Sequence, residues 1–148
     1  MIADLSLMVT SLLVGSLLMG TIGLRCAVEG LDTGTEVHVR QQIIGALRRV
    51  MPVLMTACIL TTGLAACQSG GQPKQGLAVL GFTLCVAVFA ITLSVHSPLN
   101  RVFLTWHEVS PPPNAQHMFD RWNRWDSIRA AVATAALFSM AFAVMRWP

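Results

Sequence analysis

Side chains able to do chemistry are concentrated in one stretch of this sequence, between two strongly apolar segments. Ionisable groups at the edge of an apolar segment are costly to hold there, so this stretch is the candidate functional region. Its polar and aromatic members are His96, Asn100, Trp106, His107, Glu108, His117, Trp122, Asn123, Trp125, Asp126 and Arg129. His96 and Arg129 lie closest to the flanking apolar segments and are the first candidates for a reactive site.

Three residues near the end of this stretch recur at helical spacing. Trp122, Trp125 and Arg129 are three and four positions apart, so one face of a helix presents all three. Asp126 can share that face. An arginine beside aromatic rings binds anionic or electron-rich planar ligands through charge and stacking. The spacing indicates either such a ligand site or an interfacial anchor, because tryptophan and arginine are also common where a helix meets the membrane surface.

The histidines of the region suggest a second kind of chemistry, metal ligation. His96, His107 and His117 supply imidazoles, and Glu108 and His38 could join them as ligands. The sequence has no HxH, HxxxH or CxxC spacing that would favour a metal centre. We therefore expect no bound cofactor, with copper, iron or haem as the alternative. The four cysteines are interpreted as small hydrophobic residues, without a disulfide framework.

Composition indicates the elements that position these residues. Hydrophobic residues make up 54% of the 148 positions and charged residues 11%, whereas about 25% is usual in soluble domains. A helix needs roughly 20 apolar residues to cross a bilayer. Four stretches approach that length, at about 5–24, 50–66, 77–95 and 130–145. The sequence thus predicts one all-α membrane domain over residues 1–148, a four-transmembrane-helix up-down bundle with a juxtamembrane helical extension.

Basic residues are distributed unevenly between the connections. Eight of the ten lie in or beside the connections that follow the first and third spans, and Lys74 and Arg146 lie on the other side. This bias predicts cytoplasmic long connections and N- and C-termini outside, in a membrane of the bacterial inner-membrane type. Topology accounts for the net charge of +3, so nucleic-acid binding is not required. The first span has no basic segment before it and is expected to be retained, not cleaved as a signal.

A polar helix is predicted to precede the second span and to run into it without a break. Thr33 or Thr35 is the expected cap at its N-terminus. Apolar residues recur every three to four positions from Val39 to Val50, and Arg40 lies largely off that stripe. The individual arginines of this helix are interpreted as residues at the level of the lipid phosphates.

Turns and helix breakers predict the other connections. The turn at 68–73 is short enough to make the second and third spans antiparallel neighbours. Pro98 predicts a helix stop or kink shortly after the third span. Residues 116–126 are expected to be helical and continuous with the fourth span. Small residues spaced four apart in the first span, from Ser11 to Gly20, predict close packing against a neighbouring helix.

Three blocks of residues, in this order, resemble the anthrone-oxygenase-like family of small four-helix membrane proteins. The first is EVHVRQQ at 36–42, leading to RRVMP at 48–52. The second is HSPLNR at 96–101 followed by Trp106, which is similar to the pattern xPxNxxxxxW after the third span. The third is RWNRWDSIR at 121–129, which is similar to RWxxxHxxR at the start of the fourth span. The blocks and the four spans together cover nearly the whole chain.

The resemblance implies an enzyme that oxidises a planar aromatic or hydrophobic substrate with O2, in the manner of an anthrone converted to a quinone, without flavin or haem. Such chemistry needs a base to remove a substrate proton, and donors and a cation to hold the resulting anion. The implied base is His96 or Asp126, and the implied anion-stabilising residues are Asn100 and Arg129.

Tryptophans are the implied substrate-binding residues. Trp106 and Trp122 would form the walls of a flat slot, and Trp125 is a further candidate on the same helix as Trp122. The chain departs from the family pattern at four of its positions: His107, Glu108, Asn123 and Asp126.

Two other classes of function stay open on the sequence. One is a non-enzymatic membrane accessory or small-molecule-binding protein, which the small size of the chain suits. The other is a metal- or haem-binding redox membrane protein. The expected partners are a hydrophobic aromatic small molecule, O2 and the lipid bilayer, with no nucleic acid, and a homo-oligomer is an open alternative.

Overall fold

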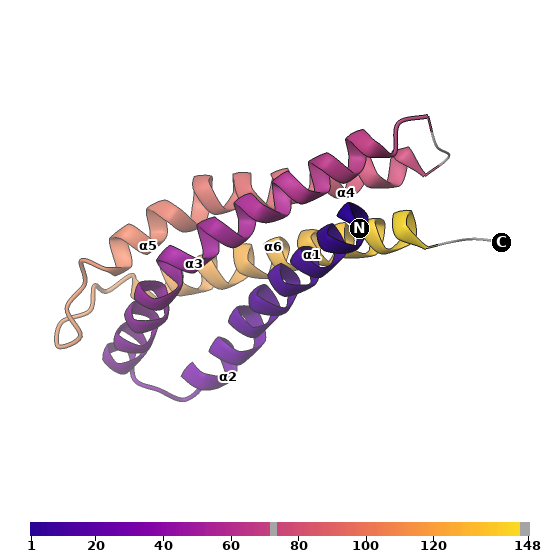
Figure 1. Ribbon diagram of the computed structural model, residues 1–148. Helices are drawn as coiled ribbons and strands as arrows, with labels where there is room; N and C mark the ends of the chain where they lie inside the picture. The colour runs from indigo at the N-terminus through magenta and orange to yellow at the C-terminus, as the bar shows by residue number, and fades with distance from the viewer. Residues whose placement is uncertain (72–73, 146–148) are drawn as a thin grey trace.

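The computed structural model describes residues 1–71 and 74–145, which form four long helical rods (Figure 1). The first rod joins α1 (Ile2–Leu18), the π-helical segment η1 (Met19–Gly23) and α2 (Leu24–Val28), and the second is α3 (Thr33–Gln68). The third joins α4 (Gln75–Ile91), the π-helical segment η2 (Thr92–His96) and α5 (Ser97–Phe103), and the fourth is α6 (Ala115–Val144). All four rods are long and apolar enough to cross a membrane, which confirms the predicted fold class.

Each rod packs against two others, so the rods enclose a common interior. α1 packs against α3 and α6, and α4 packs against the same two helices. The N-terminus, the C-terminal end of α6 and the α3–α4 turn lie at one end of the bundle, and the other two connections lie at the opposite end (Figure 1). This is the predicted up-down order. Gln72 and Pro73 of the turn, and Arg146, lie outside the described residues.

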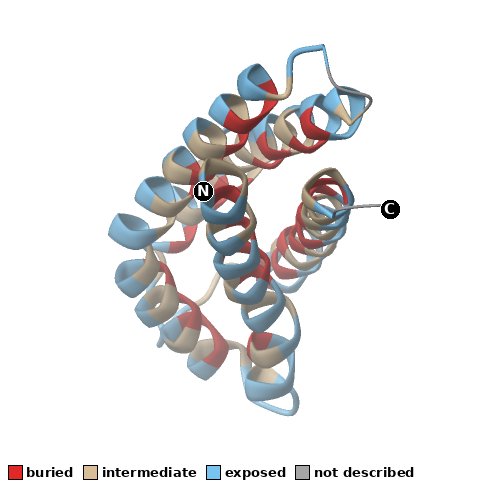
Figure 2. Cartoon of the chain, turned by 45° about the vertical axis from the view of Figure 1, so that its right-hand side comes forward, coloured by how far each residue is buried: buried red, intermediate tan, exposed pale blue. Residues whose placement is uncertain are grey.

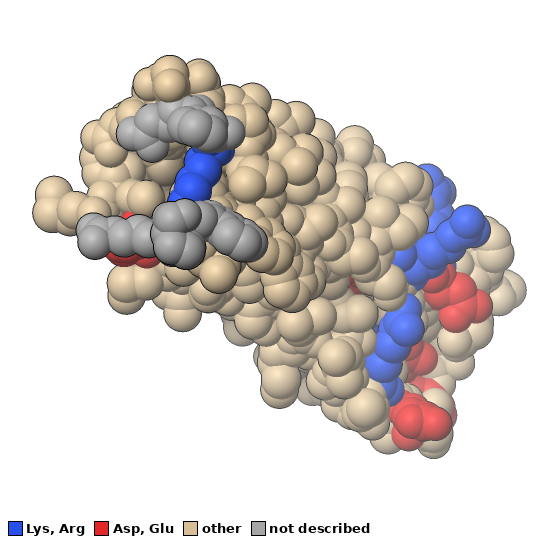
Figure 3. Space-filling view, turned by 90° about the vertical axis from the view of Figure 1, so that its right-hand side faces the viewer, with Lys and Arg blue, Asp and Glu red and all other residues tan. Residues whose placement is uncertain are grey.

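The helices bury one face and expose the other (Figure 2). Many of the exposed residues are large and apolar. Leu13 and Val88 are buried in the core, whereas Leu12, Val53 and Leu60 are well over half exposed. A belt of this kind suits lipid contact, because lipid replaces water as the solvent for outward faces. Charged side chains gather mainly toward one end of the molecule (Figure 3). All four cysteines are free.

The second rod begins at a cap that the sequence analysis did not identify. Asp32 is the N-cap residue, and its carboxylate accepts hydrogen bonds from the Thr35 amide at 3.0 Å and the Thr35 hydroxyl at 2.6 Å. These bonds lower the pKa of the Asp32 carboxyl. Thr33 and Thr35 lie inside the helix, so the prediction that one of them is the cap was wrong. The helix does run on into the second span as predicted, and Pro52 lies inside it.

The buried face of α3 also differs from the predicted stripe. Its buried positions near the N-terminus include Glu36, Val37 and Arg40, whereas Val50 is 57% exposed. The predicted stripe ends on the lipid-facing side, because an apolar residue in a membrane helix is stable on either face. The spacing of apolar residues therefore does not indicate which face of a membrane helix is buried. For this reason the sequence analysis predicted that Arg40 lies away from the interior, and that prediction was wrong.

Close helix packing occurs at Gly81 of α4 and not at the small residues of α1. A Cβ atom at Gly81 would lie 2.7 Å from Met140 Sδ of α6, so a larger residue there would require the Met140 side chain to move. A Cβ atom at Gly15 would meet nothing within 4 Å, and Ser11 bonds the Leu7 carbonyl of its own helix. The predicted close packing is therefore wrong at Ser11 and Gly15, whereas a Cβ atom at Gly20 would lie 3.9 Å from Asp126 Oδ2 of α6.

Candidate functional site

The two π-helical segments place polar residues against the same stretch of α6. η1 and η2 belong to different rods, and both contact α6. A π turn widens the helix by one residue and often marks a functional site. η2 also ends two residues before Pro98, whose ring and missing N–H disfavour an ordinary α-helical turn. The rod continues past Pro98 to Phe103, so the stop was wrong, whereas the kink, the other alternative at Pro98, stays a prediction.

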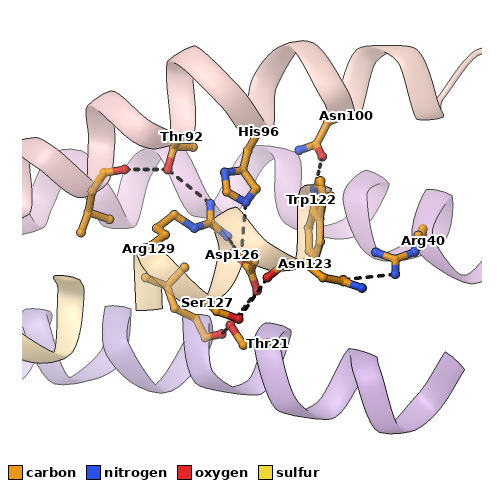
Figure 4. Close-up of polar contacts among 12 residues, drawn as sticks. Thr21, Arg40, Thr92, His96, Asn100, Trp122, Asn123, Asp126, Ser127 and Arg129 are labelled. Atoms are coloured by element: carbon orange, nitrogen blue, oxygen red, sulfur yellow. Dashed lines mark hydrogen bonds and ion pairs between the residues drawn. The ribbon is translucent and has the colours of Figure 1, made fainter. Parts of the chain in front are cut away.

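Asp126 is the centre of a buried polar cluster (Figure 4). Its Oδ1 accepts a hydrogen bond from Arg129 Nη2, and its Oδ2 accepts one from the Thr21 hydroxyl of η1 at 2.6 Å. Arg129 also donates from Nη1 to the Thr92 hydroxyl of η2 at 3.3 Å. Asp126 and Arg129 are 1% and 9% exposed. Two opposite charges buried this deeply are stable only as a pair, because either one alone would keep its full desolvation cost.

His96 faces this pair from η2. Its Nε2 lies 3.6 Å from Asp126 Oδ1, beyond hydrogen-bond length, and the side chain is 1% exposed. Neither ring nitrogen makes a hydrogen bond with the described residues. Buried polar atoms are usually paired, so an imidazole in this position calls for an explanation.

Trp122 and Asn100 border the cluster on the side of α5. The Trp122 indole N–H donates to Asn100 Oδ1 at 2.9 Å, and its ring meets the His96 ring edge-on with 5.4 Å between centroids. Figure 4 shows His96 and Trp122 side by side above Asp126. The indole is thus fixed at both ends, by a hydrogen bond to Asn100 and by ring contact with His96.

A second buried ion pair lies on the other side of Trp122. Arg40 of α3 is 1% exposed and donates to Glu36 Oε1 from Nε at 2.9 Å and from Nη2 at 2.6 Å. Arg40 Nη2 also donates to Asn123 Oδ1 of α6 at 3.2 Å. The guanidinium lies over the rings of Phe119 and Trp122, 4.4 Å and 5.3 Å from their centroids. Trp122 therefore separates two arginine–carboxylate pairs, and the cation–π contacts hold Arg40 against it.

An aromatic layer continues from Trp122 toward the α5–α6 connection. The rings of Phe103, Trp106 and Phe119 contact one another with centroids 4.9 to 5.7 Å apart. Gln41 fixes the backbone beside them, because its amide donates to the carbonyls of Phe103 at 2.8 Å and Trp106 at 3.0 Å.

The sequence analysis named seven catalytic or substrate-binding residues, and five of them lie together in the buried cluster around Asp126. These five are His96, Asn100, Trp122, Asp126 and Arg129. Trp106 belongs to the adjoining aromatic layer. Trp125 is half-buried and takes no part in the polar or ring contacts among the described residues. Trp122 and Arg129 thus both lie at the buried cluster and Trp125 does not contact it, and a ligand site on this face of α6 stays a prediction.

The candidate metal ligands are dispersed. His107 and His117 are exposed, whereas His96 is buried. His38 instead pairs with Glu108, with Nδ1 and Oε1 2.5 Å apart on the surface. Within residues 1–71 and 74–145, no group of three or more His, Cys, Asp or Glu side chains is placed to hold a metal ion.

Four polar residues of the two clusters were not identified from sequence: Thr21, Glu36, Arg40 and Thr92. The threonines lie in apolar segments where a hydroxyl usually bonds its own helix backbone. Thr21 does so too, because it also donates to the Leu17 carbonyl. The i, i+4 spacing of Glu36 and Arg40 was a usable signal for an ion pair, although it gave no sign of burial.

The arrangement combines the parts that proton abstraction from carbon requires. An imidazole with unbonded nitrogens can accept a proton, and a guanidinium beside it can hold developing negative charge. Asp126 lies next to both and balances the charge of Arg129. Low polarity around the cluster strengthens each of these interactions.

Comparison with known proteins gives the family directly. The sequence profile of the anthrone oxygenase family matches residues 41–139, more than half of the chain and the segment that carries His96, Asp126 and Arg129. No curated protein and no solved structure shows significant similarity to the chain. The matched segment includes most of α3 and all of α4 and α5. On this match, the chain belongs to the anthrone oxygenase family.

Proposed function

We propose that the protein is a membrane-embedded oxygenase that oxidises a planar phenolic aromatic molecule with O2, an anthrone to a quinone. The observation that carries this proposal is the buried His96, whose ring nitrogens are unbonded and whose Nε2 lies 3.6 Å from Asp126 of the Asp126–Arg129 pair. Family membership supports an oxygenase-like role, and the geometry supports a site for proton abstraction.

In the proposed first step, His96 takes a proton from the substrate's benzylic CH2 group. Asp126, 3.6 Å from His96 Nε2, stabilises the imidazolium that forms. Arg129 and the Asn100 amide hold the phenolate oxygen of the substrate anion, and Trp122 stacks against its rings with Trp106 and Trp125 as further binding residues. Removal of the proton leaves an electron-rich carbanion, which O2 can oxidise directly.

The remaining steps balance without a further reductant. The carbanion adds to O2, and the resulting peroxide anion takes the proton back from the His96 imidazolium to give a hydroperoxide at the former CH2 carbon. Loss of water from this hydroperoxide forms the second carbonyl group, so one oxygen atom enters the quinone and the other leaves as water. No metal, flavin or haem is needed for this route, and none is expected.

The membrane contributes to the proposed reaction. Apolar surroundings concentrate both O2 and a flat aromatic substrate. Most basic residues flank the end of the bundle that holds the α2–α3 and α5–α6 connections, and the positive-inside rule assigns that end to the cytoplasm, with both termini outside (Figure 3). The site would then lie toward the cytoplasmic side of the membrane.

Turnover of anthrone by the purified protein in lipid nanodiscs tests the proposal. The wild-type chain should form anthraquinone faster than empty nanodiscs, and His96→Phe and Asn100→Ala should each lose most of this rate while remaining folded. Arg121→Ala, an exposed arginine on the same helix, is the matched control and should keep full activity. Equal rates for wild type and His96→Phe would refute the assignment.

Metal analysis and a visible spectrum on the same preparation separate the proposal from its alternatives. A colourless protein free of copper, iron and haem that turns over anthrone supports the cofactor-independent oxygenase. A stoichiometric metal or haem would support the metal- or haem-binding redox protein instead. A metal-free protein that does not turn over anthrone would support a non-enzymatic binding protein.

A further inference from the structure

A cleft opens on the face of α6 that adjoins the buried cluster. Its volume is about 640 Å³, within the range of roughly 300–1,000 Å³ that is usual for small-molecule sites. The lining residues are Arg25, Asp120, Asn123, Arg124, Ser127 and Ile128. Arg25 comes from α2 and the other five from α6, so the cleft lies along the seam between these helices.

Only a thin layer separates this cleft from Asp126. Ser127, the next residue on α6, lines the cleft. Thr21 and Arg25 are one helical turn apart on the first rod. Thr21 bonds Asp126 Oδ2, while Arg25 Nη2 donates to the Ser127 hydroxyl at 2.8 Å and the Asn123 carbonyl at 3.0 Å. These three hydrogen bonds close the seam between the cleft and the buried carboxylate.

The charge of the lining favours an anion. Arg25 and Arg124 contribute two positive charges and Asp120 one negative charge, which leaves the cleft at +1. A neighbouring cleft of about 360 Å³ shares Arg25 but is also lined by Glu29 and Glu36, which leaves it at −1. An anionic group is therefore attracted to the first cleft and repelled from the second. Arg25, at the border of the two, has an exposed guanidinium whose present acceptors are an uncharged hydroxyl and a carbonyl.

We propose that this cleft binds flat aromatic molecules that carry an ionised oxygen, a phenolate or a carboxylate, with Arg25 as the anion-binding residue. A charged oxygen replaces the Ser127 hydroxyl and the Asn123 carbonyl as the acceptor of the Arg25 N–H groups, because a charge-assisted hydrogen bond is stronger than a neutral one. Release of those bonds loosens the seam beside Asp126. The aromatic class of the ligand rests on the proposed function. Arg25 itself lies outside residues 41–139, the segment that matches the family profile.

Binding of two non-reacting quinones tests the inference independently of turnover. Anthraquinone-2-carboxylate and 2-(hydroxymethyl)anthraquinone share the ring system and differ in charge. Equilibrium dialysis against wild-type protein in phosphatidylcholine nanodiscs, corrected for empty discs, should show about tenfold tighter binding of the carboxylate. Arg25→Ala should reduce this preference to about twofold or less, Arg25→Lys should retain part of it, and Arg121→Ala should leave it intact.

Three results would overturn the inference. The first is equal affinity of wild type for the two quinones, and the second is an unchanged preference in Arg25→Ala. The third is loss of carboxylate binding when phosphatidylglycerol is added to the nanodiscs, which would assign the cleft to lipid headgroups. If the carboxylate preference depends on Arg25 but anthrone is not turned over, the binding site stands and the proposed oxygenase reaction falls.

Discussion

Replacing Asp126 with alanine should destabilise the folded protein more than any exposed substitution can. The change leaves the Arg129 guanidinium, 9% exposed, without its carboxylate partner, and also removes the acceptor of the Thr21 hydroxyl. Breaking a buried pair by removing one partner costs about 3–5 kcal/mol of unfolding free energy. Loss of the Thr21 hydrogen bond adds about 1 kcal/mol.

A double variant separates the charge effect from packing. Asp126→Leu combined with Arg129→Met replaces both charges with apolar groups of similar size, so most of the lost stability should return. Unfolding in mixed micelles with increasing sodium dodecyl sulfate, followed by far-ultraviolet circular dichroism, measures all variants on one scale. Arg121→Ala is the control and should change stability by less than about 0.5 kcal/mol. The reasoning fails if Asp126→Ala matches that control, or if the double variant is no more stable than the single one.

Four further results are expected. Arg40→Met leaves the Glu36 carboxylate buried without its partner and should cost about 3–5 kcal/mol in the same unfolding titration, whereas an effect under about 0.5 kcal/mol would contradict the burial of this pair. Gly81→Leu should lower stability by about 1–3 kcal/mol because the new side chain overlaps Met140, and Met140→Ala in the same chain should recover part of the loss. Trp122→Phe keeps an aromatic ring but removes the N–H that donates to Asn100. Anthrone turnover should therefore fall by about tenfold, and the free energy of unfolding should fall by about 1 kcal/mol. Unchanged turnover would exclude a role for this hydrogen bond in positioning the site. Dialysis of the wild type against a metal chelator should leave anthrone turnover unchanged, and a loss that copper or iron restores would contradict the cofactor-independent route.

Much of the fold could be predicted because membrane insertion depends on properties that a sequence displays directly. Apolar length identifies the spanning helices, and short connections make neighbours antiparallel. The gathering of His96, Asn100, Trp122, Asp126 and Arg129 could also be anticipated, because these residues are polar or interfacial in type and close together along two adjoining helices.

The missed residues have a physical explanation in common. Arg40 is buried by the fold, but its sequence neighbours describe a surface helix, since apolar residues in a membrane protein occur on both faces. Thr21 and Thr92 reach Asp126 and Arg129 through π turns, which no residue pattern in η1 predicts. Pro98 indicated a disturbance of the α-helical hydrogen bonds in the third rod. It could not indicate that the disturbance takes the form of the π-helical segment η2 and that the rod continues beyond it.

Turnover of anthrone under ¹⁸O2 by metal-free protein in nanodiscs tests the central claim most directly. The account predicts one ¹⁸O atom in each quinone and one in water, at a rate that requires His96 and is lost in His96→Phe. Quinone formation at the rate of empty nanodiscs, or an undiminished rate in His96→Phe, would contradict the assignment of the reaction to the His96–Asp126–Arg129 cluster.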